Sequence, residues 1–120
     1  MRERTSDVDC TKALVDIGRM ILIELPSLVS IILEAMTRFP ISDDEIHSIA
    51  LSFIDEVLEV MNANDYYYHG EIGAYIEYYL LLAYTKPAHD VVMKWQVHRS
   101  EHLTDNFKFI RKRYAEHGFS

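Results

Sequence analysis

The sequence predicts an all-α fold, a compact bundle of four to five helices whose long first helix is kinked or broken near Pro26. Apolar residues return every three or four positions along most of the chain, and no stretch alternates polar and apolar residues as a strand would. A chain of 120 residues has room for a single hydrophobic core, and 49% of its residues are hydrophobic. We therefore expect one helical domain over residues 11–118, preceded by a flexible segment of residues 1–10.

The first helix is expected to be interrupted because the apolar segment Met20–Met36 contains Pro26. Proline lacks the backbone N–H that a helix needs, and its ring clashes with the preceding turn. The segment also contains Glu24 and is shorter than the roughly 20 apolar residues that cross a bilayer, so we expect no membrane span. The predicted buried stripe of this region consists of Leu14, Ile17, Ile21, Leu25, Leu28, Ile32 and Met36.

The second helix has the clearest start in the sequence. Ser42 and Glu45 have the spacing of a capping box, in which two side chains satisfy free backbone N–H groups of the first turn. Asp43 and Asp44 are acidic residues in the same region, where the helix dipole favours them. The expected buried stripe consists of Ile46, Ile49, Phe53, Val57 and Val60.

Two further helical regions complete the predicted bundle. One begins near Glu71, directs Tyr78 outward and buries a stripe of Ile72, Tyr75, Ile76, Tyr79, Leu82 and Ala83. Pro87 suits a first helical turn and opens the last region, which is one long helix or two helices broken near Thr104. The apolar stripe of that region consists of Val91, Val92, Trp95, Leu103, Phe109, Ile110 and Tyr114.

Charge is distributed unevenly along the chain. Residues 39–85 contain nine acidic residues and neither Lys nor Arg, so no ion pair within that stretch can neutralise them. The net charge of the whole chain is −7, although residues 86–120 alone are basic. An acidic surface repels phosphate backbones and steers basic molecules towards it. We therefore expect a basic protein partner and no direct binding of nucleic acid.

A turn rich in tyrosine follows the acidic residues of the second helix. Three consecutive large rings in a turn cannot all be buried against one core, and tyrosine is favoured at interfaces for its large, rigid contact area. The predicted partner-binding residues are Asp55, Glu56, Glu59, Asp65, Tyr66, Tyr67, Tyr68 and Glu71. The alternatives are an ordinary solubilising surface for the acids and a small buried cluster for the tyrosines.

Two histidines have the spacing of a metal site. His98, Glu101 and His102 match the H-x-x-E-H pattern of inverted zinc peptidases, in which histidines four residues apart share a helix face. The sequence offers no obvious third ligand, and two histidines in a polar seam between helices explain the pattern equally simply. We therefore expect neither a bound metal nor another cofactor, with metal binding by His98 and His102 as a minor alternative.

The segment Arg111–Gly118 resembles the arginine-to-histidine motif of HEPN ribonucleases, which are small helical domains that often dimerise. The resemblance covers these few residues, and a lysine follows the arginine where another polar residue is usual. It implies that Arg111 would stabilise phosphate charge and that His117 would transfer a proton. A HEPN-like ribonuclease is therefore the alternative function.

The sequence as a whole favours a non-catalytic inhibitor or regulator of the immunity-protein, antitoxin or antiactivator type. Its acidic, tyrosine-rich face would dock on a basic nuclease toxin or nucleic-acid-binding regulator. Cys10 is the only cysteine, and no secretory signal is evident at the N-terminus, so we expect a cytoplasmic protein. The apolar load of the first helix and of the Trp95 stripe also leaves a homodimer open.

Overall fold

The computed structural model describes residues 4–63, 70–95 and 101–119, with backbone only for residue 4 and residues 101–106. Within these ranges the chain forms six α-helices and one short 3-10 helix, and no strand. The elements are α1 (Arg4–Ile21), η1 (Pro26–Leu28), α2 (Val29–Met36), α3 (Asp44–Ala63), α4 (Gly70–Ala83), α5 (Lys86–Trp95) and α6 (Glu101–Glu116). The predicted all-α class is confirmed, with six helices in place of the expected four or five.

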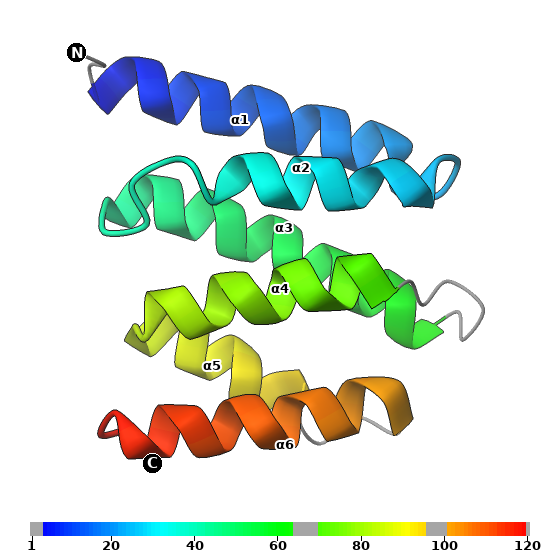
Figure 1. Cartoon of the computed structure of the whole chain (residues 1–120). Helices are drawn as coiled ribbons and strands as arrows, with labels where there is room; N and C mark the ends of the chain where they lie inside the picture. The colour runs from blue at the N-terminus through cyan, green and yellow to red at the C-terminus, as the bar shows by residue number, and fades with distance from the viewer. Residues whose placement is uncertain (1–3, 64–69, 96–100, 120) are drawn as a thin grey trace.

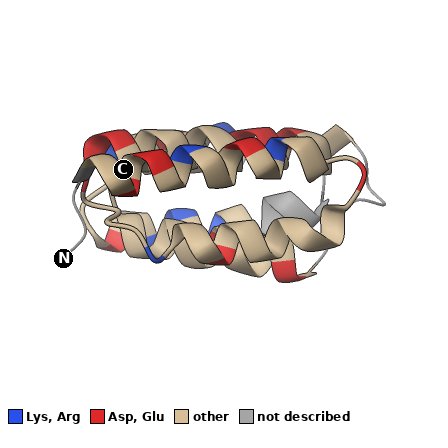
Figure 2. Cartoon of the chain, turned by 90° about the horizontal axis from the view of Figure 1, so that it is seen from above, with Lys and Arg blue, Asp and Glu red and all other residues tan. Residues whose placement is uncertain are grey.

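The helices form two layers in a zigzag stack (Figure 1). Helices α1, α3 and α5 lie side by side in one layer, here called the odd layer, and α2, α4 and α6 form the even layer. Consecutive helices run in opposite directions, so the chain alternates between the layers as it descends from α1 to α6. The molecule is a slab of 41 × 38 × 17 Å. Figure 2 shows both layers from the α1–α2 end of the stack.

The expected interruption near Pro26 is confirmed as a complete break between two helices. Helix α1 ends at Ile21, and its last turn is closed by the Leu25 N–H, which donates to the Ile21 carbonyl at 2.9 Å. Pro26 is the first residue of η1, where its missing N–H costs nothing. None of the described helices is both long enough and apolar enough to cross a bilayer.

The buried stripe predicted for the first region is wrong in part. Ile17, Leu25 and Leu28 are exposed, whereas Val15 of α1 and Leu22, the residue after α1, are buried. Gly18 explains which of the two apolar faces of α1 turns inward. A Cβ atom at Gly18 would lie 2.5 Å from Cζ of Phe53 on α3, so only glycine allows the two helices to approach this closely. The face that contains Gly18 is therefore the buried one.

The N-terminal ends of α1 and α3 also differ from the expectation. Helix α1 begins at Arg4, so residues 4–10, expected to be flexible, are helical, and Val8 is buried. Helix α3 is capped by Asp43 and not by Ser42. The Asp43 carboxylate accepts hydrogen bonds from the backbone N–H groups of Glu45 and Ile46 at 3.0 and 3.1 Å. An aspartate satisfies these free N–H groups as well as a serine does and adds a favourable charge.

The core lies between the layers and is rich in large rings. Trp95, Tyr79, Tyr114, Phe53 and Phe107 are its largest fully buried side chains. The last region contains two helices: α5 ends at Trp95 and α6 begins at Glu101, so Thr104, the predicted position of a break, lies within α6. Phe107 of α6 is buried, whereas Phe109, predicted to be buried, is 49% exposed. Leu82, also predicted to be buried, is exposed on α4.

The Gly18 contact predicts a specific loss of stability. Replacing Gly18 with alanine forces the buried Phe53 ring to move, and overpacking of this kind exceeds the gain in helix propensity. We expect Gly18→Ala to lower the free energy of unfolding by about 1–2 kcal/mol in urea denaturation. Gly70→Ala is the matched control, because a Cβ atom there would meet nothing within 4 Å. Equal losses in the two variants would contradict this account of the α1–α3 contact.

Candidate functional site

The structure brings part of the predicted acidic face together. Asp55, Glu56 and Glu59 lie on α3 in the odd layer, and Glu59 is exposed while the other two are half-buried. Glu71 lies on α4 in the even layer, where its carboxylate accepts a hydrogen bond from the Ser30 hydroxyl at 3.4 Å. Glu71 therefore does not share a surface with the acids of α3. Residues 65–68, the predicted acidic and tyrosine anchors, lie outside the described residues.

The acids of α3 are paired with cations from the neighbouring helices of the same layer. The Arg19 guanidinium on α1 donates to the two carboxylate oxygens of Glu56 at 3.1 and 2.9 Å. This hydrogen bond raises the pKa of Arg19. On the other side of α3, Lys94 Nζ lies 3.6 Å from the Glu59 carboxylate. Residues 39–85 contain neither Lys nor Arg, and the side chains that pair with these acids, Arg19 and Lys94, come from outside that stretch.

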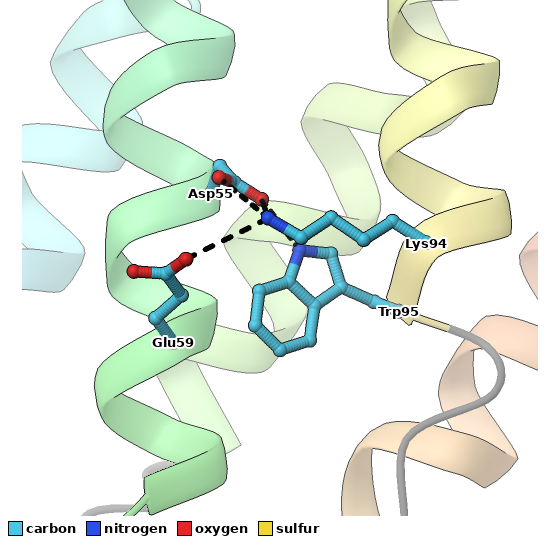
Figure 3. Close-up of polar contacts among 4 residues, drawn as sticks. All are labelled: Asp55, Glu59, Lys94 and Trp95. Carbon is cyan, nitrogen blue, oxygen red and sulfur yellow. Dashed lines mark hydrogen bonds and ion pairs between the residues drawn. The ribbon is translucent and has the colours of Figure 1, made fainter.

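Asp55 joins α5 to α3 through two side chains (Figure 3). Its carboxylate accepts hydrogen bonds from Lys94 Nζ at 2.9 and 3.0 Å and from the indole N–H of Trp95 at 2.7 Å. Lys94 Nζ also lies 4.9 Å from the centre of the Trp95 ring, within the range of a cation–π contact. Because Trp95 is fully buried, its N–H needs this acceptor. Asp55 is thus primarily a structural residue.

A groove of about 450 Å³ runs between α3 and α5. Leu51 and Val91 contribute apolar surface to its lining, and Ser48 and Ser52 contribute small polar side chains. The charged residues that line it are Asp44, Asp55, Asp90 and Lys94, three acids and one base, which give a formal charge of −2. This α3–α5 groove has the size of a ligand or peptide-side-chain site.

A second groove of about 400 Å³ lies on the other side of α3, against α1. Ser48 and Ser52 line both grooves, so they form a low ridge between them. They are exposed and stand one helical turn apart, on the outward side of the odd layer. The α1–α3 groove is bordered by Lys12, Asp16 and Arg19. The two grooves and the serine ridge between them together form an elongated surface along α3.

A buried histidine lines the α3–α5 groove from below. His47 is only 5% exposed, and both of its ring nitrogens have partners: Nδ1 lies 2.8 Å from the Tyr79 hydroxyl, and Nε2 lies 2.6 Å from the Thr85 hydroxyl. Burial lowers the pKa of His47, although the nearby Asp44 carboxylate opposes this effect. The Thr85 hydroxyl oxygen also accepts the Ala88 N–H at 3.3 Å. His47 therefore links α3 to α4 and to the start of α5.

The histidines and the arginine considered for metal binding or catalysis lie in the last part of the chain. His98 lies outside the described residues, as does the side chain of His102. His117 follows the end of α6, where its ring stacks on Tyr84 at 3.6 Å and its Nδ1 lies 2.9 Å from the Arg113 carbonyl oxygen. Arg111 is exposed on α6, six residues before His117. In the described part of the chain no three His, Cys, Asp or Glu residues gather in a way that could hold a metal ion.

No protein-family model, curated protein or solved structure matches this chain. The residues themselves are therefore the basis for assigning a function. The features with the clearest physical meaning are the two grooves beside α3 and the ion pairs that border them.

The structural role of Asp55 predicts that its loss destabilises the fold. In Asp55→Ala the buried indole N–H of Trp95 would lose its acceptor, which costs about 1–3 kcal/mol. Glu59→Ala is the matched control, since its 3.6 Å contact with the same lysine is exposed and contributes less than about 0.5 kcal/mol. Urea denaturation measures both values. A Glu59 variant that loses as much stability as the Asp55 variant would refute the distinction.

The lowered pKa of His47 predicts a loss of stability in acid. The unfolded chain binds a proton near the ordinary histidine pKa of 6.5, whereas the folded chain resists protonation until lower pH. Stability therefore falls as the pH drops below about 6.5. Urea denaturation of wild type and His47→Gln at about pH 7.5 and about pH 5.5 separates this contribution from that of the carboxylates. The variant should lose less stability than wild type between the two values; an equal loss would assign the effect to other groups.

Proposed function

We propose that the protein is a non-catalytic binding module that docks on a basic protein through the outward face of the odd layer. The observation that carries the proposal is the α3–α5 groove, an open hollow of about 450 Å³ with three aspartates and one lysine in its lining. A cationic side chain of a partner would gain electrostatic attraction from these aspartates. Its aliphatic stem would cover the apolar surface of Leu51 and Val91.

The shape of the face favours an elongated segment of the partner. The serine ridge is low, and a groove follows each side of it, so a helix or extended strand could lie along α3 and direct side chains into both grooves. Small residues at the centre of a docking surface allow a partner's backbone to approach closely. The surrounding helices are fixed by buried contacts, which reduces the cost of ordering the site when a partner binds.

The acids of this face differ in their availability to a partner. Asp55 is committed to Trp95 and Lys94. Asp44 forms no ion pair with a described Lys or Arg side chain. Asp90 pairs at 2.6 Å with Lys86, and because both side chains are mostly exposed, that pair contributes at most about 1 kcal/mol. We therefore assign the electrostatic role chiefly to Asp44 and Asp90, with Glu59 and Glu56 at the edge of the face.

The net charge of the protein indicates the kind of partner that it would bind. A protein of net charge −7 is steered towards basic surfaces, such as those of nucleases and nucleic-acid-binding regulators. By covering such a surface it would act as an inhibitor of the immunity-protein, antitoxin or antiactivator type. Asp65 and Tyr66–Tyr68 directly follow the end of α3 in sequence, and their role as anchors stays a prediction. The cytoplasmic location stays a prediction too.

The arrangement of polar groups supports binding more than catalysis. Both nitrogens of His47 are engaged by hydroxyl groups, so this histidine is a poor candidate for a general base in the groove. His117 stacks on Tyr84 and its Nδ1 lies against the Arg113 carbonyl oxygen, and these contacts give no comparable support to the ribonuclease alternative.

Affinity capture with matched baits tests the docking face. Ser48→Lys places a long cation on the ridge, where it blocks both grooves and repels a basic partner. Ala74→Lys makes the same charge change at an exposed position of α4 in the even layer. Each bait is incubated with lysate of the source organism at low and at high salt, and the bound proteins are identified by mass spectrometry.

We expect wild type and Ala74→Lys to retain the same basic protein at low salt, and Ser48→Lys to lose at least about nine-tenths of it. High salt should release that protein from every bait, because screening weakens charge attraction. Equal retention by Ser48→Lys and Ala74→Lys would exclude the odd-layer face as the docking site.

A further inference from the structure

The first pair of helices carries most of the exposed apolar surface of the described chain. Six of the nine large hydrophobic side chains that are exposed lie between residues 17 and 31, and their exposure ranges from 40% for Leu28 to 79% for Met20. The six residues are Ile17, Met20, Ile23, Leu25, Leu28 and Ile31. They belong to α1, the connecting turn, η1 and α2, which lie together at one end of the stack (Figure 1). We call this surface the apolar end.

Helix geometry directs these side chains away from the rest of the protein. On α1, Ile17 and Met20 are about 200° and 140° around the helix from the buried Val15. On α2, Ile31 is two residues from both the buried Val29 and the buried Leu33, which is about 160° around the helix from each. The inner faces of α1 and α2 already pack against α3 and α4. The outer faces have no neighbour among the described residues, and they form the terminal surface of the stack.

The opposite end of the stack is different in character. Helix α6 exposes Lys108, Arg111, Lys112 and Arg113. Stacked helix pairs bury a continuous core, and a terminal pair needs a polar outer face to keep that core from water or from other molecules. The α5–α6 end has such a charged face and the α1–α2 end lacks it. An exposed apolar end of this kind marks an interaction site.

Charge identifies a second copy of the chain as the occupant. Around the apolar end, Asp16 lies 3.7 Å from Arg19, which also pairs with Glu56, and Glu34 lies 3.5 Å from Arg38. With the exposed Glu24 of the connecting turn, residues 16–38 contain three acids and two bases, a formal charge of −1. Figure 2, viewed from this end, shows acidic and basic residues interspersed on the helices. Two copies of a protein of charge −7 repel each other through most orientations, but this surface is nearly neutral. It matches another neutral apolar surface and offers little attraction to a strongly charged partner.

We propose that two copies associate through their apolar ends about a twofold axis. Each α1–α2 pair would pack on its counterpart as it already packs on α3–α4, which joins two stacks into one. A twofold contact uses the same surface on both copies and leaves no free apolar end, so assembly stops at the dimer. The charged α5–α6 ends would point outward. The proposal does not depend on the α3–α5 groove, whose lining residues belong to α3 and α5 and not to the α1–α2 end.

The size of the apolar end indicates a weak dimer. Helix α1 has 18 residues, which gives a length of about 27 Å, and η1 with α2 adds roughly 16 Å of helix. At a helix width of about 10 Å these lengths correspond to a footprint of roughly 400 Å² per copy. Stable interfaces bury about 800 Å² of accessible surface on each partner, so this interface lies at the low end. The dimer should therefore dissociate on dilution.

Sedimentation velocity over a wide concentration range tests the association. Wild type should shift from the 14.0 kDa monomer to a species of twice that mass as the concentration rises. Met20→Glu should weaken dimerisation at least about tenfold, because each interface would bury two like charges. Phe109→Glu is the control, since Phe109 is an exposed apolar residue on α6, at the opposite end of the stack. Both substitutions are at exposed positions, and urea denaturation would verify that the fold is intact.

The outcomes separate the proposal from its competitors. A wild type that stays monomeric at all concentrations, or that forms species larger than a dimer, overturns it. So does a dimer that Phe109→Glu weakens as much as Met20→Glu does. High salt should leave the dimer intact or strengthen it, because burial of apolar surface does not depend on charge attraction. Dissociation by salt would identify a charge-mediated contact and contradict the proposal.

The single cysteine allows a second test of which end is used. Cys10 is exposed on α1 and accepts one spin label per chain without any mutation. In the proposed dimer both labels lie on interface helices, so pulsed electron paramagnetic resonance should detect one distance shorter than 41 Å, the longest extent of a single copy. Contact through the α5–α6 ends would place the labels much farther apart, and that result would refute the assignment of the surface.

Discussion

The position of α5 against α3 depends on the carboxylate of Asp55. It accepts the Trp95 indole N–H at 2.7 Å and a hydrogen bond from Lys94 at 2.9 Å, so it satisfies a buried donor and an ammonium group at once. Trp95 is the largest fully buried side chain and the last residue of α5. The width of the α3–α5 groove follows from this contact. Helix α6 in turn packs on α5 and α4.

Buried hydrogen bonds beneath the α3–α5 groove hold its lining in place. His47 bonds to Tyr79 of α4 and to Thr85 just before α5, so three segments of the chain meet under the lining of the groove. On its outward side α3 offers only the small side chains of Ser48 and Ser52, and the grooves on both sides remain open. Two surfaces with separate physical character result. One is acidic and grooved, and the other, at the α1–α2 end, is apolar and nearly neutral.

The sequence predicted what local chemistry determines, and missed what distant contacts determine. The helical class and the break at Pro26 follow from periodicity and from a missing N–H, both of which are local. The buried face of α1 was mispredicted because its two faces are both apolar, and the choice depends on Phe53, which is 35 residues from Gly18. Likewise, the sequence shows the acidic stretch but not its pairing, because Asp55 pairs with Lys94, 39 residues later in sequence. A glycine inside an apolar helix was the one signal that could have indicated the close approach.

Nuclear magnetic resonance titration with an arginine- and lysine-rich peptide tests the central claim, that the grooved odd-layer face receives basic partners. The account predicts that the backbone amide shifts of Ser48, Leu51, Ser52 and Val91 change most and that added salt reverses the changes. Shift changes centred on the acids of α4, Glu71 and Glu77, or the absence of any localised change, would contradict it.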